Sequence, residues 1–139
     1  MEKLLKDLFL KVKNLRFFGK KNAERFVFSL LEAENEEIKS LSLLLERLSA
    51  EKSICSNCGV QGLNDPCSVC GNDNRENTLL IVENSREFYK LEMLGFFKGR
   101  YHVLNGVISP FKAQTFEDLN ISNIKDRIDK EGITEVIIG

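Results

Sequence analysis

The hydrophobic residues of the first fifty positions recur at helical spacing. Residues 3–12 place their apolar side chains on one face, and the same spacing returns at 23–31 and again from about 35 to 50. Apolar residues three and four positions apart form a stripe along one side of an α-helix. The stretch 16–20, which contains Gly19, interrupts the pattern. We therefore predict three amphipathic helices that bury a small shared core.

From Thr78 onward, short apolar runs alternate with amphipathic stretches. The expected elements are strands at 79–82, 101–104 and 133–138, helices at 85–94 and 121–130, and a loop at 105–116. We expect the first of these helices to point Phe88, Leu91, Met93 and Leu94 inward. Strands that alternate with helices predict a parallel sheet built from β-α-β units, here preceded by an all-helical part.

Composition places the chain among ordinary folded proteins. It has 139 residues, of which 42% are hydrophobic and 29% are charged. No apolar run approaches the ~18 residues that span a bilayer, and residues 1–14 lack the apolar stretch of a signal peptide. We expect a cytoplasmic protein without membrane association, in a compartment that keeps thiols reduced.

Charge is distributed unevenly along the chain. The net charge is −1, but residues 1–31 carry eight basic and three acidic side chains, which leaves +5 there and −6 in the remainder. A basic segment on an otherwise acidic protein is typical of nucleic-acid binding. The alternative explanation is a solvated helix face.

Four cysteines lie within residues 53–74, a stretch with four Gly or Pro residues and few aliphatic side chains. The pattern is Cys-x2-Cys-x8-Cys-x2-Cys, with a glycine after each pair; the ligands are Cys55, Cys58, Cys67 and Cys70. Two-residue gaps let one tight turn deliver two thiolates to a metal, and four thiolates complete the tetrahedron that zinc prefers. The glycines allow positive φ, so that N–H groups face the sulfurs. We predict one structural Zn²⁺ per chain.

This zinc would order a segment that cannot pack a core alone, because structural zinc contributes on the order of 10–16 kcal/mol to folding. Two disulfides, with three possible pairings, are the competing interpretation. A redox Cys-x-x-Cys pair is the other. The predicted reducing compartment and the repeated pair with matched glycines favour metal over both.

The order of modules, the cysteine spacing and the string GRYHVLNGVISP at 99–110 resemble the bacterial recombination mediator RecR family. The resemblance implies an α+β multi-part fold. Its parts would be a helix-hairpin-helix domain at 1–52, a four-cysteine zinc finger at 53–76 and a partial Toprim-like α/β domain with a parallel sheet at 77–139. It also implies a DNA repair and recombination accessory that is not an enzyme. Such proteins form ring-shaped homo-oligomers, bind DNA independently of sequence, and act with RecO and RecF to load recombinase onto gapped DNA.

The resemblance also assigns site residues. The family's zinc ligands fall on the four cysteines. Its hairpin string, Leu-Pro-Gly-Ile-Gly, falls on 15–19, where Arg16 replaces the proline and Phe17 replaces the first glycine. We expect a phenylalanine there to oppose the required turn. Lys20, Lys21 and Arg25 keep the positive charge and are the predicted DNA-backbone contacts; ordinary surface charge is the alternative.

Two segments depart from the family. After Ser109–Pro110 the family has a Gly-rich loop, whereas this chain has 111–116, FKAQTF. The family also continues beyond the strand that matches 133–138, whereas this sequence stops at Gly139. A truncated member, a fragment or a degenerate copy would each account for that, and each predicts an exposed apolar strand.

Glu83 ends the first strand of the α/β region, where ligands of parallel sheets bind. In Toprim enzymes a glutamate there joins an Asp-x-Asp pair to hold Mg²⁺, but that pair is absent from this sequence. A Toprim-type Mg-dependent nucleic-acid enzyme fragment is therefore an alternative function, and a zinc-stapled protein–protein adaptor is another. His102, the single histidine, is expected to serve packing or hydrogen bonding.

Overall fold

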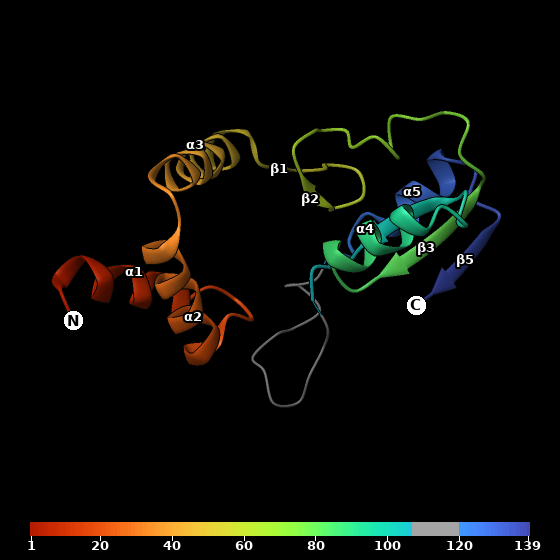
Figure 1. Cartoon of the computed structure of the whole chain (residues 1–139). Coiled ribbons are helices and arrows are strands. Elements are labelled where there is room, and N and C mark those ends of the chain that lie inside the picture. Colours follow the sequence, from red (N-terminus) through yellow and green to blue (C-terminus); the bar gives the residue numbers. More distant parts are fainter. Residues whose placement is uncertain (107–119) are drawn as a thin grey trace. The chain divides into compact units, whose positions relative to one another are not determined.

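A computed structural model describes residues 1–106 and 120–139 (Figure 1). These residues form two compact units, Met1–Ser49 and Ala50–Gly139, called here the N-terminal and C-terminal units. The end of the family string, 107–110, the divergent segment 111–116 and most of the predicted loop 105–116 lie outside the described residues.

The N-terminal unit contains the predicted helices. They are α1 (Lys3–Lys13), α2 (Gly19–Glu32) and α3 (Asn35–Glu51). The first two pack together around Val12, Ala23 and Val27. The expected three-helix core is wrong, because no residue of α3 is buried. Leu43, Leu44, Leu45 and Leu48 are each more than half exposed.

The C-terminal unit is built on a parallel sheet, as the alternation of elements predicts. Its order is β4 (Arg100–Val103), β3 (Thr78–Val82), β5 (Glu135–Ile138), with β3 in the centre. Leu80 lies opposite Tyr101 on one side and Ile137 on the other. The strands alternate with helices α4 (Ser85–Leu94) and α5 (Ile124–Lys130), which Figure 1 shows beside the sheet. This confirms the α+β fold class.

Both helices differ from the predicted ones in detail. Phe88 of α4 is buried and Leu91 packs on the core, but Met93 is 87% exposed and Leu94 is 57% exposed, so their expected inward placement is wrong. Two residues rotate a helix by about 200°, which turns Met93 away from the face of Leu91; Leu94 is the last helical residue. The predicted helix at 121–130 begins only at Ile124.

The cysteine segment joins the core of the sheet. It forms a short antiparallel pair, β1 (Ser53–Ile54) with β2 (Gln61–Gly62). Val60 and Val69 of this segment are buried in one cluster with Val82, Phe88, Tyr101 and Val103. The segment has no separate core of its own, as predicted, and apolar packing on the sheet holds it in addition to the predicted metal. The boundaries at residues 52 and 76 stay a prediction.

Strand β5 presents apolar side chains to solvent. All four of its residues are exposed, Ile138 to 80%. This agrees with the predicted exposure of an apolar strand. Throughout residues 1–106 and 120–139, no helix has the length and apolarity needed to cross a membrane.

Candidate metal centre

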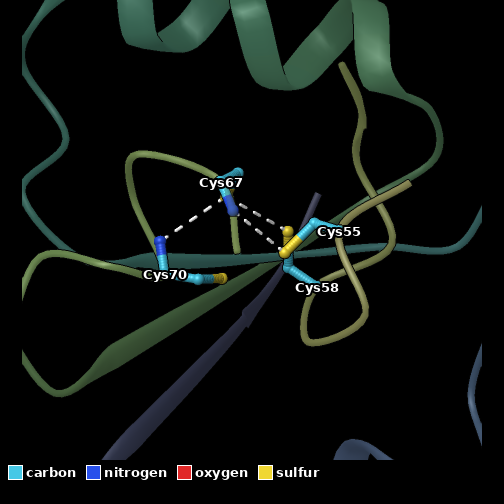
Figure 2. A group of neighbouring side chains, drawn as sticks. All are labelled: Cys55, Cys58, Cys67 and Cys70. Carbon is cyan, nitrogen blue, oxygen red and sulfur yellow. Dashed lines mark hydrogen bonds between the residues drawn. The ribbon is translucent and has the colours of Figure 1, made fainter. Parts of the chain in front are cut away.

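The four cysteine sulfurs converge on one point between two loops (Figure 2). All four Sγ atoms lie within 4.8 Å of one another, and the Sγ atoms of Cys58 and Cys67 are 3.7 Å apart. A regular tetrahedron with metal–sulfur bonds of ~2.3 Å has sulfur–sulfur edges of about 3.8 Å. The four cysteines are free thiols, three buried and Cys70 half-buried. Donor type and spacing therefore fit a tetrahedral metal ion.

The two loops have the same hydrogen-bonded turn. Gly59 N–H donates to the Cys55 carbonyl at 2.8 Å, and Gly71 N–H donates to the Cys67 carbonyl at 2.9 Å. Gly59 has the predicted positive φ, at 82°, but Gly71 does not. The N–H groups that face sulfur belong to cysteines instead: Cys67 N–H lies 3.4 Å from the Cys55 sulfur. These donors stabilise thiolate charge.

A carboxylate ties the two loops together without metal. Asp65, two residues before Cys67, accepts hydrogen bonds from the Ser56 N–H at 2.8 Å and from the Ser56 hydroxyl at 2.9 Å. Ser56 follows Cys55 directly. This link holds the loop of the first cysteine pair next to the loop of the second.

The thiols compete with one another for protons. Hydrogen bonding with Cys67 and Cys70, together with burial, raises the pKa of Cys58. Hydrogen bonds from Cys58 and Cys70 lower the pKa of the Cys67 thiol. Several thiolates at this separation repel one another, and a divalent cation relieves that repulsion for all of them. The cluster therefore has the electrostatics of a cation site.

Direct hydrogen bonds attach the first cysteine loop to the sheet. Val103 N–H, at the end of β4, donates to the Cys58 carbonyl at 2.8 Å. Asn105 Nδ2 donates to the Gly59 carbonyl at 2.9 Å. A Cβ atom on Gly59 would lie 2.9 Å from the Val103 carbonyl and still closer to the Asn120 amide. Only glycine allows the loop to approach the strand this closely.

A buried ion pair provides a second attachment. Arg127 of α5, only 3% exposed, donates to both carboxylate oxygens of Glu131 at 2.9 and 3.0 Å and to the Tyr101 carbonyl at 2.7 Å. Glu131 also accepts from Asn57 Nδ2 at 2.8 Å, in the first cysteine loop. Burial by itself raises the pKa of Glu131, but hydrogen bonds from Arg127 and Asn57 outweigh it and lower that pKa. Helix, strand and cysteine loop thus share one network.

His102 extends this network, as its predicted hydrogen-bonding role requires. It is fully buried, with Nδ1 at 3.0 Å from Arg127 Nη1 and Nε2 at 2.5 Å from the Asn120 carbonyl. A guanidinium only donates, so Nδ1 accepts and Nε2 carries the proton. Burial, reinforced by the Arg127 charge, lowers the pKa of His102 and keeps the ring neutral.

Glu83 lies where the sequence predicts, directly after β3, and is exposed. In the part of the chain that the structure describes, the cysteine quartet is the one group of three or more His, Cys, Asp or Glu side chains arranged to hold a metal ion. Glu83 is not part of it.

The predicted hairpin turn forms despite Phe17. Phe18 N–H donates to the Leu15 carbonyl at 3.2 Å, and Phe17, the third residue of this turn, has φ 67°. Positive φ at the third position defines a type II turn, for which glycine is preferred. The expectation that phenylalanine opposes the turn is thus wrong in outcome. The left-handed conformation costs a residue with a Cβ atom roughly 1–2 kcal/mol.

The predicted DNA-contacting cations follow this turn on α2. Lys20, Lys21 and Arg25 are all exposed. Lys21 and Arg25, one helical turn apart, line a shallow hollow together with Glu24 and Phe28, whereas Lys20 is not among its lining residues. The structure therefore brings two of the three predicted side chains to one face.

Sequence reasoning missed Arg127, Glu131, Asn57 and Asn120. One signal was available, because Arg127 lies three residues after Ile124 and one before Ile128, on the face predicted to be buried. A charged residue at such a position needs a partner. Glu131, four residues later, is at the spacing that supplies one within a helix.

Comparison with known proteins gives consistent matches. Residues 77–139 match the family model of the Toprim domain. The chain is 35% identical to the Recombination protein RecR of Natranaerobius thermophilus, over 86% of this chain and 61% of that protein. It is 33% identical to that of Syntrophobacter fumaroxidans, over 97% of this chain and 68% of that protein. It is 39% identical to that of Herpetosiphon aurantiacus, over 86% of this chain and 59% of that protein. The chain thus spans about three fifths to two thirds of the length of these relatives.

Proposed function

Because the chain belongs to the RecR family of recombination proteins, we propose that it is a DNA repair and recombination accessory that binds DNA backbone without reading sequence. The observation that carries this proposal is the set of exposed cations on α2, directly after the hairpin turn. Lys21 and Arg25 share one face, so both can approach neighbouring phosphates of one strand. Phosphate contacts position a protein on DNA but carry no sequence information.

The metal in this proposal is one structural Zn²⁺, held by Cys55, Cys58, Cys67 and Cys70. Four thiolates satisfy zinc completely and leave no vertex for water or substrate, which is the pattern of structural rather than catalytic sites. The 3.7 Å separation between the Cys58 and Cys67 sulfurs supports this ligand set.

The whole-protein role follows the family. We propose that the protein is not an enzyme, that it assembles into a ring-shaped homo-oligomer, and that it acts with RecO and RecF to load recombinase onto gapped DNA. The RecR name of the relatives supports the place in recombination. If several copies join, one weak cationic site per copy suffices for tight overall binding.

Salt dependence of DNA binding tests the proposal. Affinity for a gapped duplex is measured across salt concentrations for the wild type and for Lys21→Glu/Arg25→Glu. Each lost phosphate contact lowers the slope of log K against log salt by about 0.9 on duplex DNA and about 0.7 on a single strand. The double variant should therefore bind weakly, with a slope reduced by roughly 1.4–1.8. Lys39→Glu, on the exposed face of α3, is the control that changes charge elsewhere. A salt-independent affinity, or equal slopes in all three proteins, would overturn the proposal.

A Toprim-type Mg-dependent enzyme fragment is the second candidate. The Toprim match over 77–139 and the position of Glu83 after β3 favour it. Magnesium-dependent turnover of nucleic acid that Glu83→Gln abolishes would establish it. If repair survives Lys21→Glu/Arg25→Glu undiminished, the zinc-stapled adaptor becomes the better account.

A further inference from the structure

Two adjacent phenylalanines in the hairpin turn have different surroundings. Phe18 is half-buried and packs edge-on against Phe26 of α2, with ring centroids 5.7 Å apart. Phe17 is 83% exposed. Burial in the helical core therefore does not explain why a large aromatic side chain occupies position 17.

Backbone conformation makes the choice of residue more unusual. Phe17 has φ 67°, a value that glycine adopts without the steric penalty that a Cβ atom brings. An aromatic ring that is mostly in solvent recovers little of that penalty through burial. Left-handed residues other than glycine are concentrated at sites of function, where surrounding structure holds them.

One cation lies against this ring, and two more follow it closely in the sequence. The guanidinium carbon of Arg16 lies 5.4 Å from the Phe17 ring centroid, within cation–π range. Lys20 and Lys21 follow in the first turn of α2, and both are exposed. An aromatic surface flanked by cations is the arrangement that binds single strands, since the ring stacks on a base and the cations hold the phosphates.

We propose that Phe17 is a base-stacking residue for single-stranded DNA, with Arg16, Lys20 and Lys21 holding the phosphates next to the stacked base. This inference rests on the proposed DNA binding and adds a preference for unpaired bases. In a duplex each base face is covered by its neighbours, so the ring adds affinity only where a strand is single, as in a gap.

An abasic strand keeps the phosphates but has no bases, so it separates the contribution of stacking from the contribution of charge. Binding is measured by fluorescence anisotropy with a labelled oligothymidylate, with an abasic strand of the same length and with a duplex, using the full chain. Phe17→Gly removes the ring and relaxes the turn, so a loss of binding is not a consequence of turn strain. It should bind the oligothymidylate about tenfold more weakly, within the range of one lost stacking contact, while the other two probes change less than about twofold. Phe17→Tyr should retain wild-type affinity.

A spectroscopic readout reports the contact directly. The protein contains no tryptophan, so Phe17→Trp gives a single indole at this position. Its emission should be quenched by the oligothymidylate and not by the abasic strand.

The possible results separate the two proposals. Unchanged oligothymidylate affinity in Phe17→Gly with an unquenched indole, while Lys21→Glu/Arg25→Glu still weakens binding, overturns stacking and leaves the proposed function standing. Equal losses on all three probes also overturn stacking, because they show a general role in binding. If the wild type binds none of the probes, both proposals fail. Phe17-dependent binding of oligouridylate but not oligothymidylate would assign the site to RNA and overturn the DNA proposal.

Discussion

Replacing Arg127 by methionine tests whether the buried ion pair fixes the cysteine loop on the sheet. Methionine has a similar length but no donors. The substitution leaves the Glu131 carboxylate without its bidentate partner and leaves the Tyr101 carbonyl and His102 Nδ1 without a donor. Glu131, which accepts a hydrogen bond from Asn57 of the first cysteine loop, then loses the side chain that holds its carboxylate in place.

The expected loss follows from these contacts. Removing one partner of a buried ion pair costs about 3–5 kcal/mol. Glu131 keeps its hydrogen bond from Asn57 and the charge of Arg100, whose Nε is 3.8 Å away. We therefore expect Arg127→Met to lower the free energy of unfolding by about 3 kcal/mol, the lower end of that range. Glu131→Met should cost a similar amount, and the double variant about 2 kcal/mol less than the sum of the two, because neither charge is then left alone.

Tyrosine fluorescence during urea unfolding, with zinc in excess, is the appropriate assay. Both tyrosines, Tyr89 and Tyr101, belong to the C-terminal unit, and no tryptophan obscures them. Tyr101 is fully buried between Phe88 and Phe97. Lys125→Met, at an exposed position on the same helix, should stay within about 0.5 kcal/mol of the wild type. The ion-pair explanation is refuted if Arg127→Met is as stable as the wild type. It is also refuted if the losses of Arg127→Met and Glu131→Met simply add in the double variant.

Three further predictions test other parts of the structure. Metal removal by a strong chelator, or Cys67→Ser, should unfold the C-terminal unit, since structural zinc contributes about 10–16 kcal/mol against a typical total stability of about 5–15; unchanged tyrosine emission, or metal analysis that finds no zinc in the purified protein, would contradict this. Gly59→Ala should cost about 2–3 kcal/mol through positive φ and the close Val103 carbonyl. Gly132→Ala, where φ is +63° and no atom lies within 4 Å of the added Cβ, should cost only about 1 kcal/mol. If Gly59→Ala and Gly132→Ala lose equal stability, the close approach of the cysteine loop to β4 does not contribute to the cost. Phe17→Gly should leave thermal stability within about 1 kcal/mol, because relief of the left-handed conformation offsets the added entropy of the unfolded chain; a larger drop in a circular-dichroism melt would show that the ring supports the fold.

Local pattern was sufficient for most of the secondary structure and for the cysteine cluster that fits a metal ion. Apolar spacing predicted all three N-terminal helices and the three strands of the sheet, because helical and strand periodicity are properties of neighbouring residues. The cysteine quartet was likewise readable, since a two-residue gap within each pair is a local feature that lets one turn deliver two thiolates to a metal. The order of these modules indicated the family that the comparisons confirm.

Only the tertiary structure decided what packs against what. Asn57 reaches Glu131 across 74 positions and Arg127 reaches the Tyr101 carbonyl across 26, so no local pattern could pair them. The same holds for α3, whose apolar stripe predicts burial although none of its residues is buried. The spacing of apolar residues shows that a helix has an apolar face, but the fold of the whole chain determines whether another surface covers that face. The structure also decided the outcome at Phe17, where the sequence predicts opposition to the turn but the turn between α1 and α2 forms with a positive φ.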